Sequence, residues 1–444
     1  MNKLASLIAI FAAAPALAGT TISDVVIRQQ WPWKADVKVD FVVSGTAGGI
    51  TQVTMAAYRG DTFLGNIPQS ACSGSLIVTS DGAKSLTFDP TAVDFLVSQG
   101  VMGNFRLDVT AADATDDEIL YKIFDLTKTA GTPGAVQYVT EHALTNGLWG
   151  AWERDYWGED MARTVIWTGV TNDAAYKTTH LVMRRIPAGS FTYGTSTDCD
   201  LYVASDTPAM TVTISKPYYM AVFETTTSQY CHILDPETNN VSMYPSSYKY
   251  YLSSSKVNAI RGNSNGSSPY EWPTGRSVWG TSIVGRLRTR TGVNFDLPTE
   301  AQWEKAARAG STGIYYDSNS EVPDATRLSK LAWNYSNSKN GGDSRSSQRV
   351  GQLKPNAYGL YDVLGNVAEI VLDWQEAAYV PDPAIDPEGP TSGSNRVTKG
   401  LNYETYATSA SGSASVYMHI GNRAGVGQTA GNARWGYRFC CPAE

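Results

Sequence analysis

Two carboxylates flank a short turn in the C-terminal half of the chain and are the first candidates for metal binding. Asp362 and Glu369 lie on either side of the Leu364-Gly-Asn366 turn. A tight glycine-containing turn brings backbone carbonyl oxygens close to such carboxylates, and hard oxygen ligands of this kind suit Ca²⁺. The sequence therefore predicts a calcium site here. The alternative is that both acids are surface residues of a polar turn.

Soft metal ligands are few and scattered along the chain. No C-x-x-C pair or Cys/His cluster is present, so a zinc site is not expected. With an odd number of cysteines, at least one stays outside any disulfide in a monomer, and the pairing of the others is left open. The residues concerned are Cys72, Cys199, Cys231, Cys440 and Cys441, and His142, His180, His232 and His419.

The segment from Asn402 to Arg434 is dense in small polar residues and tyrosine. Tyrosine supplies contact area at a low cost in side-chain entropy, so this composition is typical of a recognition surface. We expect a protein or carbohydrate ligand on this C-terminal face, although an ordinary polar loop would have the same composition. The candidate contact residues are Tyr403, Tyr406, Tyr417, His419, Asn422 and Arg423.

One well-formed helix is expected upstream of these residues, in the stretch 295–310. Thr299 is a good N-cap, and Gln302 stands three residues later, where the partner of a capping box belongs. Trp303, Ala306 and Ala307 follow 3–4 spacing, so this face of the helix should pack inward. Gly310 is placed to end the helix.

Length and composition predict an exported protein of two domains. A chain of 444 residues exceeds one ordinary core. Lys3, the apolar segment 4–17 and the Ala16-Leu17-Ala18 site predict a signal peptide over residues 1–18, hence a secreted, periplasmic or cell-surface protein. No later segment reaches the length of a membrane span. The net charge of −7, with acids and bases interspersed, argues against a nucleic-acid partner.

The fold class expected is α+β, with a β-sandwich before an irregular mixed domain. Over residues 20–128, period-two runs such as Val37, Val39, Phe41 and Val43 alternate between turn signals, which favours a β-sandwich. Residues 129–179 form a tryptophan-rich linker that should pack on one of the domains. Exposed tryptophans that stack on carbohydrate are the alternative for this linker.

Residues 180–442 resemble the formylglycine-generating enzyme (sulfatase-modifying factor) family. The resemblance rests on seven blocks in the family's order: 186–191 (IPAGSF), 224–226 (ETT), 297–308 (LPTEAQWEKAAR), 355–362 (PNAYGLYD), 365–369 (GNVAE), 396–400 (RVTKG) and 436–439 (GYRF). It implies an irregular mixed α/β fold related to C-type lectins, with little regular secondary structure. The N-terminal domain lies outside the resemblance.

The resemblance also implies a set of calcium ligands. The family's structural calcium would be held by the side chains of Asp362 and Glu369 and by the backbone oxygens of Gly365 and Val367. A second family site would use Asn334, with the Tyr335 backbone and Asp343. The loop length differs here, which favours an ordinary polar loop at this second site.

The chain departs from the family where the oxidase chemistry resides. Active members carry two cysteines soon after the block that here reads Lys399-Gly-Leu-Asn-Tyr403, and those thiolates bind copper. Residues 404–435 contain no cysteine, and Cys440 and Cys441 match the pair in neither position nor spacing. Soft thiolates are what Cu(I) requires, so copper is not expected.

Three functions follow from this reading. The first is an exported binding or structural module without oxidase activity. The second is an enzyme, either an oxidase that converts a sulfatase cysteine to formylglycine with altered ligands or a member that uses non-heme iron. The third is a lectin-like protein that displays a ligand-binding face, which requires Tyr403, Tyr406, Tyr417 and Asn422 to share one exposed surface.

Overall fold

The structure is a computed structural model that divides into two compact units. One comprises residues 1–120 with 137–150, and the other comprises residues 121–136 with 151–444. The residues described are 20–29, 36–46, 51–67, 71–74, 76–97, 105–113, 120–132, 134–139, 174–196, 199, 208–246, 257–262, 272, 275–339, 344–375, 384–406, 418–427 and 433–443. The predicted signal peptide, the tryptophan-rich stretch 148–157, Asp343 and Tyr417 lie outside them.

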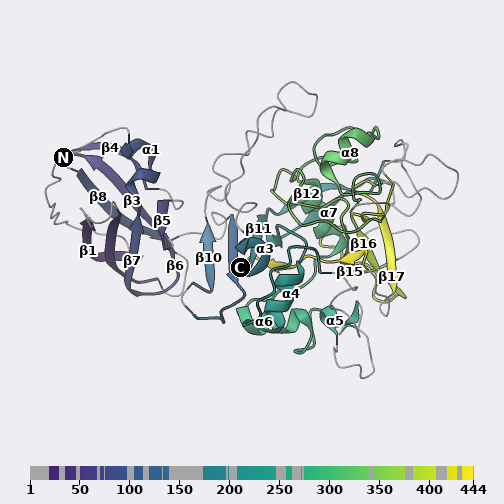
Figure 1. The fold of residues 1–444 in the computed structure, drawn as a ribbon, viewed down its shortest axis with the longest axis horizontal. Helices are drawn as coiled ribbons and strands as arrows, with labels where there is room; N and C mark the ends of the chain where they lie inside the picture. The colour runs from purple at the N-terminus through teal and green to yellow at the C-terminus, as the bar shows by residue number, and fades with distance from the viewer. Residues whose placement is uncertain are drawn as a thin grey trace. The chain divides into compact units, whose positions relative to one another are not determined.

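The first unit is built from two antiparallel sheets (Figure 1). One has the strand order β1-β2-β7-β5, and the other has the order β4-β3-β6 with β8 paired to β3. Two short helical turns, η2 (Pro90–Ala92) and α1 (Asp94–Val97), follow β7. The strands are β1 (Thr21–Gln29), β2 (Val37–Ser44), β3 (Thr51–Arg59), β4 (Thr62–Asn66), β5 (Cys72–Ser73), β6 (Ile77–Val78), β7 (Gly82–Phe88) and β8 (Phe105–Asp113).

Alternating side chains place the core of the first unit between these sheets. In β2 and β3 every second residue is buried, as the period-two pattern predicts. Val39 and Phe41 from one sheet and Val53, Met55 and Leu107 from the other belong to a single buried hydrophobic cluster. Both sheets therefore bury their apolar faces in one core.

The second unit is rich in small sheets and has few helices. One sheet has the strand sequence β9-β11-β14-β19, a four-stranded sheet has the order β17-β16-β15-β18, and β12 pairs with β13. Its strands are β9 (Tyr121–Asp125), β11 (His180–Ile186), β12 (Gly189–Tyr193), β13 (Met210–Ile214), β14 (Tyr218–Ala221), β15 (Ala368–Trp374), β16 (Asn395–Lys399), β17 (Arg423–Gly427), β18 (Trp435–Gly436) and β19 (Cys440–Pro442). Strand β10 (Val136–Val139) begins at the last residue of the segment 121–136, and its other residues belong to the first unit.

The helices of the second unit are short. They are α3 (Ala175–Thr178), α4 (Thr227–Leu234), α5 (Asn258–Arg261), α6 (Ile283–Thr291), α7 (Glu300–Arg308) and α8 (Ala325–Leu331). Helices α4 and α6 lie together, and α7 packs against β12, β15 and β16 (Figure 1). No helix among the described residues is both long and apolar enough to cross a membrane.

Strand β9 belongs to the second unit, although the sequence pattern groups it with the N-terminal strands. Residues 121–125 lie in the range 20–128 expected for the first domain. In the structure β9 pairs antiparallel with β11, with Asp125 opposite His180. The local alternation of side chains predicts a strand but not its partner, because pairing depends on contacts far along the chain.

Helix α7 forms as its sequence predicts. The Thr299 hydroxyl accepts a hydrogen bond from the Gln302 N–H, and the Gln302 side chain accepts one from the Thr299 N–H, so the capping box is complete. Trp303, Ala306 and Ala307 are buried. Ala309 ends the helix in the left-handed region, and Gly310 follows with φ +94°, which a glycine adopts without strain.

Candidate functional site

Asp362 is buried at the predicted metal turn with half of its carboxylate unengaged. Its Oδ2 accepts a hydrogen bond from the Gly351 N–H at 2.7 Å, whereas its Oδ1 has no hydrogen-bond partner among the described residues. Burial raises the pKa of Asp362 to about 6, although the Gly351 N–H and nearby cations oppose the shift. A buried, half-satisfied carboxylate of this kind favours either a proton or a cation.

Glu369, the second predicted ligand, is fully engaged by protein groups. Its Oε2 accepts hydrogen bonds from Arg438 Nε at 2.6 Å and from Trp303 Nε1 at 2.7 Å, and its Oε1 accepts one from Arg438 Nη2. All three side chains are buried. Arg438 therefore forms a bidentate, charge-assisted ion pair in the interior, which is the strongest geometry for such a pair.

The Arg438 guanidinium is surrounded by oxygen atoms on all sides. Besides Glu369, it donates hydrogen bonds to the backbone oxygens of Ala221 at 3.1 Å, Val222 at 3.3 Å and Tyr361 at 2.9 Å. A guanidinium has five N–H groups, and these contacts use all of them. The Arg438 guanidinium therefore places a positive charge beside the turn, in contact with one carboxylate and three backbone carbonyls.

Glu224 is a third buried carboxylate at the same turn. Its Oε1 accepts a hydrogen bond from the Val367 N–H at 3.0 Å, and its Oε2 accepts one from Asn366 Nδ2 at 2.6 Å. Asn366 has φ +55°, so this turn adopts a backbone conformation that needs external support. Burial and the carboxylates of Asp362 and Glu369 raise the pKa of Glu224 well above its usual value.

These contacts fit a hard cation in part. The unengaged Oδ1 of Asp362 and the acidic surroundings suit Ca²⁺, whereas both oxygens of Glu369 are already held by Arg438 and Trp303. Among the described residues no group of three or more His, Cys, Asp or Glu side chains is arranged to hold a metal ion. If a cation binds here, Glu369 contributes charge rather than an open oxygen.

Asn334, the residue predicted for a second metal site, uses its side chain within its own turn. Asn334 is buried, and its Oδ1 accepts a hydrogen bond from the Ser336 N–H at 2.9 Å. Its Nδ2 donates to the Ala332 oxygen at 3.4 Å. The Asn334 side chain therefore stabilises its own loop, an ordinary role for an asparagine at a turn.

Helix α7 carries a buried ion network on the side that faces β16 and β17. Lys399 Nζ lies 3.0 Å from Glu304 Oε2 and 3.4 Å from Glu300 Oε1. Arg423 Nη2 lies 2.9 Å from Glu300 Oε2, and Arg308 Nη2 lies 2.8 Å from Glu304 Oε1. Burial acts to raise the pKa of Glu304, but Lys399 and Arg308 outweigh it and the net effect lowers this pKa.

The same helix is bonded to further blocks of the resemblance. Lys305 Nζ donates to the Gly189 oxygen at 2.9 Å, and Asn356 Nδ2 donates to the Ala306 and Ala307 oxygens at 2.7 and 3.0 Å. Together with Trp303, these bonds tie α7 to segments that lie about 50 to 115 residues away. The helix is therefore the structural centre of the second unit.

Asp373 places another perturbed carboxyl at the start of α7. Its Oδ2 accepts a hydrogen bond from the Glu300 N–H at 2.6 Å, and its Oδ1 has no hydrogen-bond partner among the described residues. Burial, followed by the charge of Glu300, raises the pKa of Asp373 to about 7. The sequence analysis did not single out this residue, because nothing local marks it as the neighbour of a helix 73 residues upstream.

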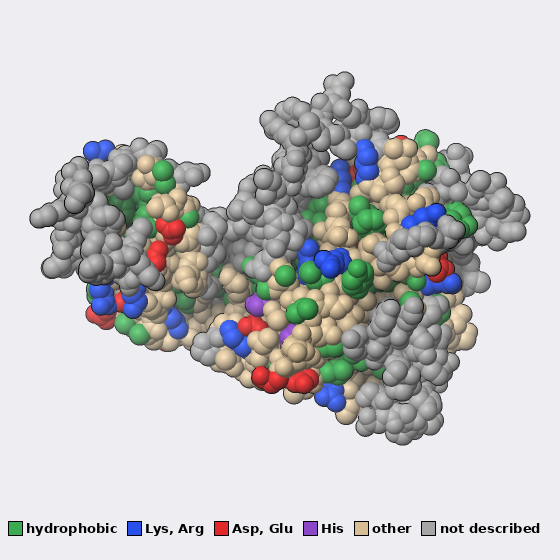
Figure 2. All heavy atoms as spheres, in the orientation of Figure 1, with side chains coloured by type: hydrophobic (Ala, Val, Ile, Leu, Met, Phe, Trp, Pro, Cys, Tyr) green, Lys and Arg blue, Asp and Glu red, His purple; other side chains and the backbone are tan. Residues whose placement is uncertain are grey.

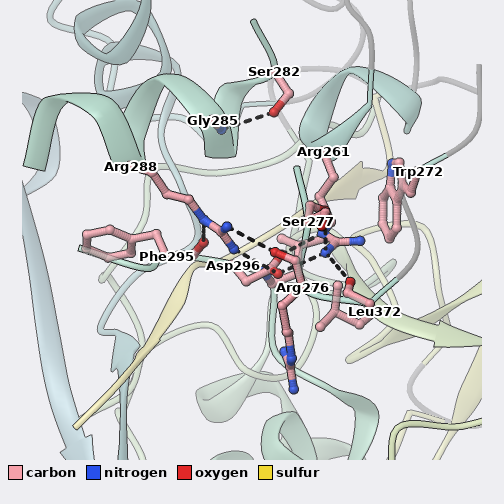
Figure 3. Close-up of polar contacts among 12 residues, drawn as sticks. Arg261, Trp272, Arg276, Ser277, Ser282, Gly285, Arg288, Phe295, Asp296 and Leu372 are labelled. Atoms are coloured by element: carbon pink, nitrogen blue, oxygen red, sulfur yellow. Dashed lines mark hydrogen bonds and ion pairs between the residues drawn. The ribbon is translucent and has the colours of Figure 1, made fainter. Parts of the chain in front are cut away.

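Arginines surround Asp296, immediately before the LPTEAQWEKAAR block. Arg261 from α5 bonds both Asp296 oxygens, at 2.7 and 3.0 Å, and Arg288 from α6 approaches Oδ2 at 3.3 Å. Figure 3 shows both guanidinium groups pointing at this carboxylate. The Asp296 backbone exchanges two hydrogen bonds with Cys440, at 2.9 and 2.8 Å, which joins β19 to the start of the block.

The C-terminal cysteines are part of this packing. Cys440 and Cys441 are buried in β19, opposite Met220 and Tyr219 of β14. All five cysteines lie in the described part of the chain, and none forms a disulfide. Burial, followed by the charge of Asp296, raises the pKa of the Cys440 thiol well above its usual value. Cys440 is therefore held as a neutral thiol.

The predicted C-terminal recognition face is corrected by burial. Tyr403, His419, Asn422 and Arg423 are all buried, so they do not share an exposed surface with Tyr406. Their side chains pack in the interior, where Arg423, for example, forms an ion pair with Glu300. Composition does not distinguish a polar loop on the surface from polar groups paired inside, which is why the sequence analysis misplaced them. Tyr417 lies outside the described residues.

The Tyr406 side chain is exposed, and Tyr335 stacks on one face of its ring. It is 53% exposed, and its ring stacks on Tyr335 with centroids 4.0 Å apart and planes at 27°. The Arg345 guanidinium carbon lies 3.2 Å from the Tyr335 ring centroid. Tyr406 is a contact residue predicted from the sequence, whereas no local pattern marks Arg345, and Tyr335 was expected to contribute only its backbone.

Comparison with known proteins identifies the family of the second unit. The chain is 27% identical over 249 residues to the formylglycine-generating enzyme of Mus musculus. The aligned region covers 49% of this chain and 65% of the mouse enzyme. It is 39% identical over 120 residues to that of Thermomonospora curvata, which is 25% of this chain and 40% of the other. The chain thus spans less than two thirds of either relative.

Two solved structures are similar over most of their own length. Treponema denticola variable protein 1 has a TM-score of 0.42 and 24% identity, and the similarity covers 59% of this chain and 95% of that one. PvdO from Pseudomonas aeruginosa has a TM-score of 0.41 and 21% identity, and the similarity covers 59% of this chain and 94% of that one. Residues 170–440 match the family described as "Sulfatase-modifying factor enzyme 1-like domain". Because this match covers more than half of the chain, the protein belongs to that family.

Proposed function

We propose that this chain is an exported member of the family that acts as a binding or structural module and lacks the copper–cysteine oxidase site. The observation that carries the proposal is the absence of any cysteine from residues 404–435, together with the burial of the two C-terminal cysteines. Without a thiolate pair, Cu(I) has no soft ligands at the position that the family uses.

The C-terminal cysteines do not replace the missing pair. Adjacent residues of a strand point to opposite faces of the sheet, so Cys440 and Cys441 do not converge on one metal ion. The raised pKa of Cys440 disfavours its thiolate, which is the form that binds metal and attacks substrates. The interior position of both residues supports a packing role.

The architecture proposed with this function is a β-sandwich followed by a C-type lectin-like domain. A sandwich is supported by the two antiparallel sheets of the first unit, which share one core. A lectin-like domain is supported by the few short helices and small sheets of the second unit, and by its family.

A structural calcium ion beside Asp362 remains part of the proposal. The unengaged Asp362 Oδ1 and the backbone oxygens of Gly365 and Val367 would hold it, and the ion would supply positive charge to a turn with three buried carboxylates. Arg438 and Trp303 position Glu369 without the ion. We assign the ion no role beyond stabilising this turn.

The face drawn in Figure 2 is consistent with a neutral or mixed-charge partner. On the face drawn in Figure 2, acidic and basic side chains of the described residues are interspersed among neutral ones. A partner of one strong charge would call for a field of the opposite sign. We therefore infer a protein or carbohydrate partner.

The decisive experiment measures copper and turnover together. The mature protein is incubated with Cu(I), desalted and assayed with a cysteine-containing sulfatase peptide, beside the Thermomonospora curvata enzyme as positive control. We expect no stoichiometric copper and no loss of peptide thiol beyond the buffer rate. Copper near one equivalent with formylglycine production would overturn the proposal. N-terminal sequencing of protein from its native cells tests export, with Gly19 expected as the first residue.

A further inference from the structure

The exposed ring of Tyr406 is the outer layer of a three-layer stack. A guanidinium 3.2 Å from the Tyr335 centroid and a ring 4.0 Å from the same centroid cannot share one face of that ring without overlapping. Arg345 and Tyr406 therefore lie on opposite faces of Tyr335. One face of Tyr406 rests on Tyr335, and the other belongs to the exposed part of the side chain.

The stack is rigid because its members are also bonded through the backbone. The Tyr335 N–H donates to the Thr405 oxygen at 2.9 Å, and Arg345 Nε donates to the Tyr335 oxygen at 2.6 Å. A preformed ring of this kind loses little conformational entropy when a ligand covers it.

The chemistry around the ring selects among ligands. The face of an aromatic ring is electron-rich and attracts polarised C–H groups or cations. A cationic ammonium ligand is normally held in a cage of several rings, whereas the ring contacts of Tyr406 with described residues come from Tyr335 alone. Two residues earlier, Glu404 forms a partly exposed ion pair with Arg434 and offers both acceptors and donors. Sugar hydroxyls, which donate and accept, match such a pair.

We propose that the exposed face of Tyr406, backed by Tyr335 and Arg345 and two residues along the chain from Glu404 with its partner Arg434, is a stacking platform for a neutral pyranose unit of a glycan. The inference rests on the proposed function as a binding module and names its ligand class. One apolar face of the sugar ring covers Tyr406, and its edge hydroxyls bond with Glu404 and Arg434. No covalent chemistry is involved.

Affinity electrophoresis of the full mature chain in native gels tests the platform. The gels contain laminarin, xylan, galactomannan or soluble starch as neutral probes, and polygalacturonate as an acidic one. We expect retardation by at least one neutral polysaccharide. Tyr406→Ala should weaken that interaction about tenfold or more. Tyr406→Phe, which keeps the ring, should stay within about twofold of the parent protein.

Tyr244→Ala is the matched control, because Tyr244 is also an exposed tyrosine, at 39%, outside the stack. It should leave retardation unchanged. If Tyr406→Ala does not fold, saturation-transfer NMR on the unmodified protein replaces it, with transfer expected to the C–H groups of one face of the bound sugar. Uniform transfer over both faces would contradict the stacking geometry.

Three outcomes overturn the platform: no retardation by any neutral polysaccharide, retardation by polygalacturonate alone, or full retention of binding by Tyr406→Ala. Each of them leaves the copper and turnover result untouched, so the absence of an oxidase site would still stand. Conversely, copper-dependent turnover with intact glycan binding would overturn the proposed function but keep the platform.

Discussion

Arg438 and Glu369 form a bidentate ion pair in the interior of the second unit, where both side chains are excluded from water. The two residues belong to different blocks of the family, 69 positions apart, and Trp303 of α7 joins them through Glu369. The pair therefore links the turn at residues 364–366, helix α7 and the segment between β18 and β19. In this chain the turn is held by a guanidinium, whatever else binds beside it.

Breaking that pair should be costly. Glu369→Gln leaves the Arg438 charge buried without its carboxylate, which should lower the free energy of unfolding by about 3–5 kcal/mol. Urea denaturation of both proteins at pH 7 measures the difference. Glu404→Gln is the control, since the Glu404–Arg434 pair is partly exposed and should contribute no more than about 1 kcal/mol. Equal effects of the two substitutions would contradict the interior role of Glu369.

The caps of α7 and α4 should differ in strength. Thr299→Ala removes one hydrogen bond of the capping box and should cost about 1 kcal/mol. Thr226→Ala should cost more, because the Thr226 hydroxyl also donates to the Lys177 oxygen at 2.7 Å. Thermal unfolding of both variants, with the corresponding Thr→Ser proteins as controls, tests the order. A larger loss for Thr299→Ala would show that the extra bond contributes nothing.

Stability should depend on pH through Asp362. Its folded pKa of about 6 lies above the value of about 3.9 in an unfolded chain, so the folded state binds this proton more tightly. The stability that it contributes is complete below pH ~4 and is lost as the pH rises through 6. In EDTA, the parent protein should therefore lose about 2–3 kcal/mol relative to Asp362→Asn between pH 4 and pH 8. A difference that does not change with pH would refute the raised pKa.

Calcium should restore, at neutral pH, the stability that is lost when Asp362 ionises. Binding to ionised Asp362 would stabilise the folded state by mass action, by about 1–2 kcal/mol at roughly ten times the dissociation constant. Thermal unfolding after EDTA treatment, with and without millimolar CaCl₂, measures this. Asp362→Asn should lose the response, whereas Asn334→Ala should keep it, because Asn334 is engaged by its own loop. If CaCl₂ does not change the thermal unfolding of the parent protein, the proposed calcium site is wrong.

The sequence predicted local features well. The capping box at Thr299, the buried face of α7 and the alternation in β2 follow from short-range spacing and are confirmed. Each depends on residues within about one turn of a helix or along one strand. The family resemblance is likewise confirmed by the match over residues 170–440.

The interior pairs could not be predicted in the same way. Lys399 reaches Glu300 and Glu304 across about 100 residues, and Arg438, between β18 and β19, reaches Glu369 of β15. Periodicity carries no information about such pairs, and charged residues are assigned to the surface by default. For the same reason Tyr403 and Asn422 were expected on an exposed face and are buried.

The central claim is that the family fold is present here without its oxidase site. The most direct measurement follows formylglycine production by mass spectrometry, using a cysteine-containing sulfatase peptide and protein loaded with Cu(I), with bound copper determined on the same sample. We expect less than a tenth of an equivalent of copper and no product, while the Thermomonospora curvata enzyme converts the peptide in parallel. Product formation that requires copper and is lost in Cys440→Ser would contradict it.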